Sequence, residues 1–178
     1  MPRPSGDSGC PPRARPYGGT ANVRPVWWPS AKGVKDQRSF PRNPKHPVNR
    51  KVAEAMKKGI IVLFAAANCG ETCPDQRCGE YVGPGKSIWA PGALSEVMTV
   101  AAVNLREEWV GYSSQGPSAV EKNKPDFASI THFTGWGKCD NGTSAACPVA
   151  AGVVALLKGA NPRLSQEVAK KLLMETAK

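Results

Sequence analysis

The chain has 178 residues, enough for one domain with its own core, and a formal net charge of +10. The first 58 residues carry 13 of the 24 Lys and Arg, 10 of the 17 prolines and 3 of the 14 Asp and Glu, so the net charge sits there. No apolar run reaches the roughly 18–20 residues of a membrane span, and the N-terminal stretch lacks the apolar centre of a signal peptide. The sequence therefore predicts that the protein is not a membrane protein.

Residues 1–42 are predicted to form a poorly ordered, basic, Pro-rich arm, because they lack the apolar residues of a core. Such an arm can bind the phosphates of nucleic acid. No helix-turn-helix, zinc-finger or aromatic stacking pattern accompanies the charge, so nucleic-acid binding is the weaker interpretation. Residues 43–178 are predicted to form the folded part of the chain.

The first predicted element of the folded part is a helix over residues 48–58, with Gly59 as its stop. The continuously apolar run "IIVLFAAA" (60–67) follows and predicts a strand buried on both faces, as in a parallel sheet. A second strand of this kind is predicted over residues 97–103. "WVGYSSQGPS" is interpreted as a short strand and turn, and "KPDFASI" as another short extended piece.

Two helices are predicted after these strands. The first covers roughly residues 144–159, with Pro148 tolerated in its first turn. The second covers residues 165–177, where Ser165 serves as the cap and the apolar stripe consists of Val168, Leu172 and Leu173. This order of helix, buried strands and further helices predicts an α/β fold with a mostly parallel sheet and flanking helices.

Three of the six cysteines fall in the turn-rich stretch "NCGETCPDQRCG", at Cys69, Cys73 and Cys78. The spacing lacks the paired C-x2-C units or nearby histidines of a zinc site, so no metal is predicted there. A disulfide-tied loop is favoured over free thiols, and a disulfide would imply an oxidising compartment. Cys147 lies in an apolar helix pattern and is interpreted as a small buried residue.

Ser144 stands at the mouth of the first of these helices, in "NGTSAACPVAAG". Backbone N–H groups in a first helical turn lack intrahelical partners and can stabilise an oxyanion on an attacked carbonyl. The small neighbours Gly142 and Thr143 would let a substrate backbone come close. The alternative is that Ser144 only caps the helix, and local chemistry alone favours that alternative.

Asn68 ends the apolar run in "GIIVLFAAANCG". The carboxyl end of a parallel strand is where α/β folds place ligands, and the amide there could donate to the same oxyanion as the helix N–H groups. On its own, such an asparagine is more often a turn former. We expect the Ser144 hydroxyl and the Asn68 amide to converge on one carbonyl oxygen.

Taken together, "AAAN", "VMTVAAVN", "GYSSQGPS", "KPD" and "NGTSAACPVAAGVVALL" resemble the C-terminal half of the catalytic domain of subtilisin-like serine proteases (subtilases). The motifs run in the family's order over about residues 43–178, and "GTSAACPVAAG" is the most specific of them. The stretch from "NPKHPVN" to "PDQRCG" is also similar to a bacterial branch with a Cys-rich loop after its asparagine.

The resemblance implies a partial subtilisin-like fold and hydrolysis of peptide or protein substrates through an acyl-enzyme. It implies that Ser144 is the nucleophile, and that Asn68 and the Ser144 backbone N–H form the oxyanion hole. It further implies that Ala65, Ala66 and Ala67 help to wall the primary specificity pocket. The family most often has glycine where Ala67 stands, so the extra methyl would narrow the pocket.

The family's other two triad motifs, an Asp-Thr/Ser-Gly turn after a strand and a His-Gly-Thr-His helix start, do not occur in the sequence. The lone Asp7-Ser8-Gly9 lies in the Pro-rich arm, and His46 and His132 are interpreted as ordinary surface or turn histidines. A serine hydroxyl needs a base. We therefore expect a truncated form that is inactive alone and lacks the N-terminal half of the catalytic domain.

This expectation leaves three functions to compare. The first is a serine endopeptidase of subtilase type, inactive without its missing half. The second is a pseudoprotease that holds peptides without cleaving them, and the third is nucleic-acid binding through the arm. No cofactor is predicted, and no ligand cluster for calcium or another metal is legible in the sequence.

Overall fold

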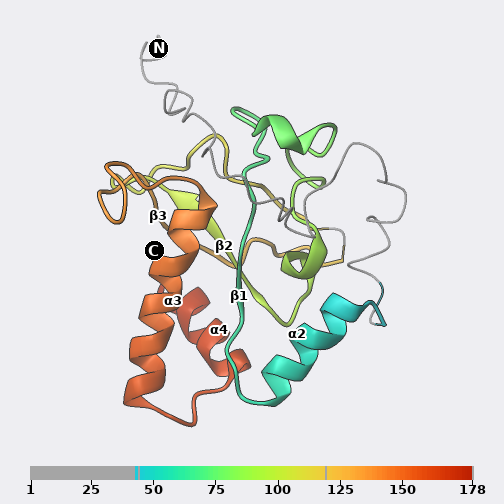
Figure 1. The fold of residues 1–178 in the computed structure, drawn as a ribbon, viewed down its shortest axis with the longest axis vertical. Coiled ribbons are helices and arrows are strands. Elements are labelled where there is room, and N and C mark those ends of the chain that lie inside the picture. Colours follow the sequence, from blue (N-terminus) through green and yellow to red (C-terminus); the bar gives the residue numbers. More distant parts are fainter. Residues whose placement is uncertain (1–42, 44, 119, 178) are drawn as a thin grey trace, which may run out of the picture.

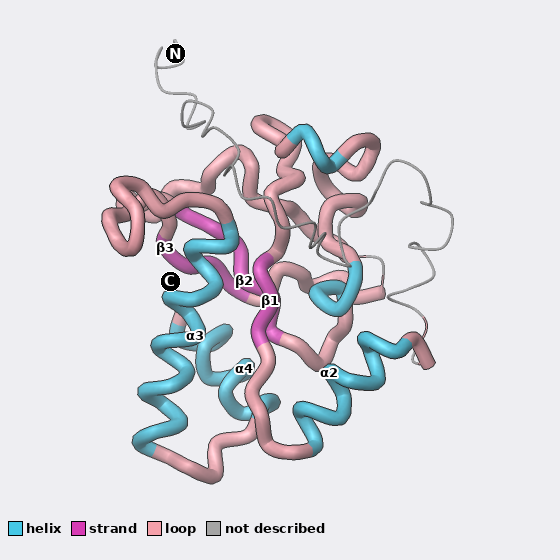
Figure 2. Tube along the Cα trace, in the orientation of Figure 1, coloured by secondary structure: helices cyan, strands magenta, loops and turns pink. Residues whose placement is uncertain are grey.

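The computed structural model of the chain describes residues 43, 45–118 and 120–177, so the predicted arm lies outside the described residues. Figures 1 and 2 show the elements, which are grouped around a small sheet. In chain order they are α2 (Pro47–Lys57), β1 (Leu63–Ala65), the 3-10 turns η1 (Gln76–Cys78) and η2 (Ala90–Ala93), β2 (Met98–Val103), β3 (Phe127–Ile130), α3 (Thr143–Ala160) and α4 (Gln166–Thr176).

The described sheet is parallel and three-stranded, in the order β1-β2-β3. Leu63 of β1 is level with Met98 of β2, and Val100 of β2 is level with Phe127 of β3. Figure 1 shows α3 on one side of β1 and α2 on the other. The α/β prediction of a mostly parallel sheet with flanking helices is confirmed. Within the described residues β1 pairs with β2 alone, so its outer edge is open, as expected for a partial domain.

The core lies between β2 and α3. Met98, Val100 and Ala102 alternate along β2 and are fully buried toward the helices. The α3 residues buried in the same two clusters recur every fourth position and are Ala146, Ala150 and Val154. Because two of these three are alanines, the N-terminal half of α3 can approach the sheet closely, and this fixes where the helix begins.

The strand prediction holds for β2 and is only partly right for β1. The apolar run at 60–67 predicts a strand buried on both faces, but hydrogen-bonded pairing is limited to Leu63–Ala65, whose residues are half-buried. Ile60 is exposed. β1 is an edge strand, with a neighbouring strand on one side only among the described residues. The β-branched residues at the start of the apolar run therefore have no second strand to pair with there.

The stretch "WVGYSSQGPS", interpreted as a short strand and turn, contains turns, but in place of the strand it has one isolated bridge, between Trp109 and Val103. Its hydrogen bonds go to neighbouring segments: Ser113 Oγ accepts from the Ala102 amide at 3.0 Å. Its main chain also bonds to the segment after β1, for example the Gly70 amide to the Tyr112 carbonyl, and residues 112–114 are buried.

The terminal helix α4 begins as predicted, because Ser165 Oγ accepts from the Val168 amide. Its predicted apolar stripe is wrong in part, since Val168 and Leu172 are exposed. Ala169 is buried and Leu173 packs beside it on the cluster around Met98. The side of α4 that faces the sheet is thus about one residue away from the predicted one.

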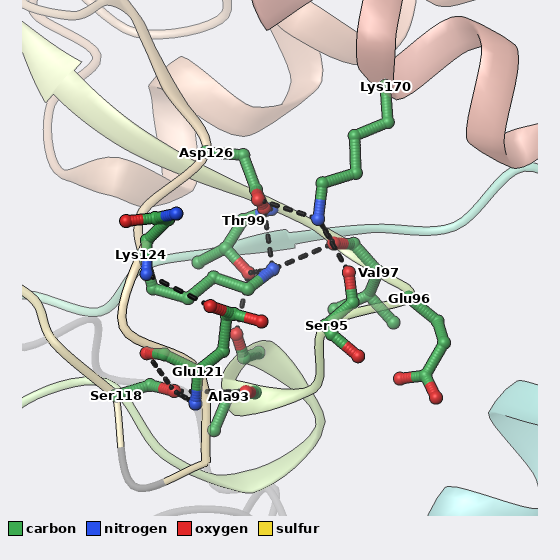
Figure 3. A network of polar contacts seen from close by, with 12 residues as sticks. Ala93, Ser95, Glu96, Val97, Thr99, Ser118, Glu121, Lys124, Asp126 and Lys170 are labelled. Atoms are coloured by element: carbon green, nitrogen blue, oxygen red, sulfur yellow. Dashed lines mark hydrogen bonds and ion pairs between the residues drawn. The ribbon is translucent and has the colours of Figure 1, made fainter.

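A buried ion cluster, shown in Figure 3, connects this side of α4 to the segment just before β3. Lys124 Nζ lies 2.6 Å from Asp126 Oδ2 and also donates to Val97 O at 2.8 Å. Lys170 of α4 reaches the other carboxylate oxygen at 2.8 Å, at an angle outside the hydrogen-bond range, so its contribution is that of a nearby charge. The Lys124 and Asp126 side chains are 0% and 1% exposed.

The helix α3 is also long and apolar enough to cross a membrane by length and composition alone. The core helices of many soluble proteins share this property, so it does not identify a membrane span. In α3 the exposed apolar side chains are Val153 and Leu156, on the side away from the sheet. This outer side is uncovered by the described residues.

Candidate active site

The short segment after β1 carries the predicted pocket residues and the predicted oxyanion donor. Ala66 is buried, while Ala65 and Ala67 are half-buried. Ala67 has a φ of 81°, a left-handed conformation that costs an alanine about 1–2 kcal/mol. Its carbonyl accepts from the Ser114 amide at 3.0 Å. The chain turns sharply here, and the turn carries Asn68 toward the start of α3.

The Asn68 amide is fixed by Thr143. Its Oδ1 accepts from the Thr143 backbone N–H and from the Thr143 hydroxyl, both at 2.9 Å. With two donors on the oxygen, the Nδ2 group faces the other way, and no described residue accepts a hydrogen bond from it. Thr143 therefore orients Asn68, and its closeness to a bound substrate stays a prediction.

Gly142 separates the two expected oxyanion donors. It has φ 82° and ψ 166°, a conformation open almost only to glycine. A Cβ placed on Gly142 would lie 3.0 Å from Asn68 Nδ2 and 3.6 Å from the Ser144 amide nitrogen. Asn68 Oδ1 lies 3.5 Å from the same point, so the Asn68 amide group and the Ser144 backbone nitrogen both lie next to the small space that glycine leaves open at position 142. The two segments are brought together as expected.

Ser144 is the second residue of α3, and its side chain is exposed. The cap position belongs to Gly142, which has no side-chain cap bond, so the interpretation of Ser144 as a helix cap is wrong. The Gly142 carbonyl accepts from the amides of Ala145 and Ala146. The Ser144 amide and hydroxyl make no hydrogen bond within the described part of the chain. Both are available to a ligand.

Pro148 lies further into α3 than predicted. The helix begins at Thr143, which places the proline inside it rather than in its first turn. Without an N–H, Pro148 cannot donate to the carbonyl of Ser144 four residues earlier. The first turn of α3 is therefore held mainly by its contacts with Asn68 and the sheet.

The Cys-rich loop stabilises the main chain at Asn68. Cys69 and Cys78 form a disulfide with an S–S distance of 2.05 Å, and Cys73 is disulfide-bonded as well. The Asp75 amide donates to the Asn68 carbonyl at 2.8 Å. The prediction of a disulfide-tied loop is confirmed for this pair. The loop therefore holds the main chain of Asn68, while Thr143 holds its side chain.

Two further cysteines are free thiols. Cys139 is exposed, and Cys147 of α3 is half-buried, whereas its apolar helix pattern predicts a buried residue. Burial raises the pKa of the Cys147 thiol to about 11, so it stays protonated at neutral pH. Among the described residues, no group of three or more His, Cys, Asp and Glu side chains is placed to hold a metal ion.

Neither described histidine contacts Ser144. His46 Nδ1 accepts from the Val48 amide at 3.3 Å at the start of α2. His132 Nε2 lies 3.0 Å from the Tyr112 hydroxyl, and burial lowers the pKa of its ring. The interpretation as an ordinary turn histidine fits His46. The contact between His132 and Tyr112 was not predicted from the sequence: Tyr112 lies in the motif "GYSSQGPS", but His132 lies in no motif.

The chain is similar to known proteins in both sequence and structure. A model of the subtilase family matches residues 27–178. The chain belongs to the subtilase family. The curated subtilases that it resembles include the serine protease AprX of Bacillus subtilis (strain 168), 28% identical over 163 residues, which cover 78% of this chain and 35% of AprX.

Bacillopeptidase F of the same strain is 33% identical over 106 residues, covering 53% of this chain and 7% of that protein. The halolysin-like extracellular serine protease Nep of Natrialba magadii is 35% identical over 95 residues, covering 52% and 17%. The chain thus spans about a third or less of the length of these three subtilases.

Solved structures show the same fold. A cold adapted subtilisin-like serine proteinase superposes with a TM-score of 0.55 at 22% identity, over 71% of this chain and 42% of that one. Sphericase gives a TM-score of 0.55 at 24% identity with the same coverage. At this identity the likeness establishes the fold: this subtilase chain carries part of a subtilisin-like domain.

Replacing Ala67 with glycine is expected to raise the free energy of unfolding by up to about 1 kcal/mol. The relief of the left-handed strain exceeds the added entropy of the unfolded chain, which is about 0.4–1 kcal/mol. Urea denaturation measures the change. The matched control is Ala65→Gly in β1, where glycine should cost about 0.5–1 kcal/mol. Equal losses in both variants would contradict the strain at Ala67.

Proposed function

We propose that this chain supplies the nucleophile and the oxyanion hole of a subtilase serine endopeptidase. Ser144 attacks the carbonyl carbon of a peptide bond, and Asn68 Nδ2 and the Ser144 N–H donate to the oxygen as it becomes an oxyanion. The observation that carries the proposal is the position of both donors within 4 Å of one point beside Gly142.

The electrostatics of the site favour this chemistry. The N-terminus of α3 carries the positive end of the helix dipole, and the developing negative charge would lie against it. Thr143 holds Asn68 in place before the substrate binds, so little reorganisation is needed. Ala65, Ala66 and Ala67 form the segment along which the acyl side of a peptide or protein substrate would lie.

The proton acceptor must come from outside the described residues. The histidine nearest in sequence, His132, has its Nε2 engaged with Tyr112. Removing the base of such a triad lowers the rate by several powers of ten, although oxyanion stabilisation alone retains some catalysis. The isolated chain is therefore inactive in practice, and activity requires a segment that carries an aspartate and a histidine.

A covalent labelling experiment tests the proposal. The chain is fused behind the part of the AprX catalytic domain that carries the Asp and His motifs, and the fusion is treated with a fluorophosphonate probe. The fusion should be labelled at Ser144, and the isolated chain should not. Asn68→Ala should lower the labelling rate about 10²–10³-fold, a magnitude known from subtilisin rather than derived from this chain.

The control variant is Ser144→Ala in the same fusion, which should abolish labelling while its thermal melting stays unchanged. Labelling that survives Ser144→Ala would contradict the assignment of the nucleophile. A folded fusion that binds peptides but is never labelled would contradict catalysis and favour a peptide-holding pseudoprotease.

A further inference from the structure

One irregular segment, 110–114, crosses between the two parts of the candidate oxyanion hole. The main-chain carbonyl of Tyr112 accepts from the Gly70 amide at 2.8 Å, two residues after Asn68. The Tyr112 hydroxyl accepts from the Gly142 amide at 2.9 Å, two residues before Ser144. One tyrosine therefore holds both the asparagine segment and the serine turn, which lie far apart in the sequence.

The peptide groups of Gly142 are held on both sides by side chains. The Tyr112 hydroxyl accepts a hydrogen bond from the Gly142 N–H, and Thr131 Oγ1 donates to the Gly142 carbonyl at 3.1 Å. Tyr112 is 7% exposed and Thr131 is fully buried. Water cannot replace these partners easily, so the unusual backbone of Gly142 depends on them.

The Tyr112 hydroxyl has a third neighbour that can titrate. His132 Nε2 lies 3.0 Å from it, and the two rings meet edge to face with centroids 5.7 Å apart. The hydroxyl also lies 3.3 Å from Thr131 Oγ1. Its single proton can therefore point to His132 or to Thr131, while its oxygen accepts from Gly142 in either case.

We propose that Tyr112 is a positioning residue for both oxyanion donors, and that the protonation of His132 sets the direction of its hydroxyl. This inference rests on the proposed function for its catalytic meaning. Its physical content is a coupling between the His132 ring and the Gly142 amide, which exists whether or not the chain takes part in catalysis.

The direction of the coupling follows from the hydrogen bonds. When His132 is neutral, Nε2 accepts from Tyr112, which makes the tyrosine oxygen a better acceptor for the Gly142 N–H. When His132 is protonated, Nε2–H competes for the same oxygen and the bond to Gly142 weakens. Within the part of the chain that the structure describes, the pair is also close to the main-chain carbonyl of Asp140, which accepts from the His132 amide, and to the Cys139 thiol. Acidification therefore loosens the turn before Ser144.

Nuclear magnetic resonance on the ¹⁵N-labelled chain tests the coupling directly. The amide resonances of Gly142 and Ser144 should shift between about pH 8 and about pH 5 with the same midpoint as the His132 ring. The shift should vanish in His132→Gln, which keeps Tyr112 in place, and should persist in His46→Gln, the matched control. Amides that do not follow His132 would overturn the inference.

The catalytic meaning is tested in the fusion with the AprX segment. Tyr112→Phe should lower the labelling rate at Ser144 about tenfold, as expected for the loss of one buried hydrogen bond, and should remove its dependence on His132. Equal labelling rates in Tyr112→Phe and the parent would overturn the positioning role. Intact coupling in a fusion that is never labelled would instead contradict the proposed function.

Discussion

Asp126→Ala is expected to lower the free energy of unfolding by about 3–5 kcal/mol, the cost of leaving a buried charge without its partner. The Lys124 side chain is fully buried, and its ammonium would lose the one carboxylate with which it pairs among the described residues. Burial lowers the pKa of Lys124 and the neighbouring Asp126 opposes this, so without the aspartate the lysine would lose its proton more readily. Thr99 would also lose the acceptor of its amide, at 2.6 Å.

Thermal and urea denaturation, followed by circular dichroism, measure this loss. Glu175→Ala is the control, because it removes a carboxylate from an exposed ion pair with Lys171 and should cost less than about 1 kcal/mol. Combining Asp126→Ala with Lys124→Met removes the uncompensated charge and should restore part of the loss. If Asp126→Ala and Glu175→Ala melt alike, the cluster does not hold α4 to the sheet.

The elements of the fold could be predicted where one periodic pattern decided them. The mostly apolar run of β2 and the recurrence of mostly small residues at every fourth position of α3 both indicate burial, which can be read directly from the sequence. The side of α4 that faces the sheet could not be predicted in this way. Polar side chains of α4 contact other segments on this side: Lys170 lies beside Asp126 and donates to the Ser95 carbonyl, and the apolar stripe of Val168 and Leu172 does not record these contacts.

The meeting of Asn68 and Ser144 could be predicted from topology, because the carboxyl ends of parallel strands and the helix starts beside them share one edge of a sheet. The atomic arrangement could not. Whether Asn68 presents its nitrogen or its oxygen depends on the two bonds from Thr143. No pattern in the sequence marks Tyr112 as the partner of Gly142, since the contact joins an irregular segment to a turn 30 residues away.

The Ala67 position shows what the resemblance adds to periodicity. As the third alanine of the run 65–67, Ala67 looks like the continuation of an apolar strand. The family's preference for glycine there indicates a turn, and the φ of 81° gives the physical reason. The methyl group is therefore a cost in backbone strain as well as a narrowing of the predicted pocket.

Gly142→Ala is expected to lower the rate of fluorophosphonate labelling of the fusion by at least about 10²-fold. This is the effect of losing one oxyanion donor. The new methyl would lie 3.0 Å from Asn68 Nδ2, in the space where the substrate oxygen is proposed to bind. The backbone would also be forced out of a conformation that costs other residues about 1–3 kcal/mol. The bonds from Tyr112 and Thr131 would then be misaligned.

Gly152→Ala is the matched control in the same helix. A Cβ at Gly152 meets nothing within 4 Å, and alanine in a helix interior is worth about 0.5–1 kcal/mol over glycine, so this variant should be labelled normally and melt higher. Retention of labelling in Gly142→Ala within a few-fold of the parent would place the oxyanion elsewhere. Such a result would contradict the proposed oxyanion hole, whereas the coupling between His132 and the Gly142 amide is tested separately by the amide titration.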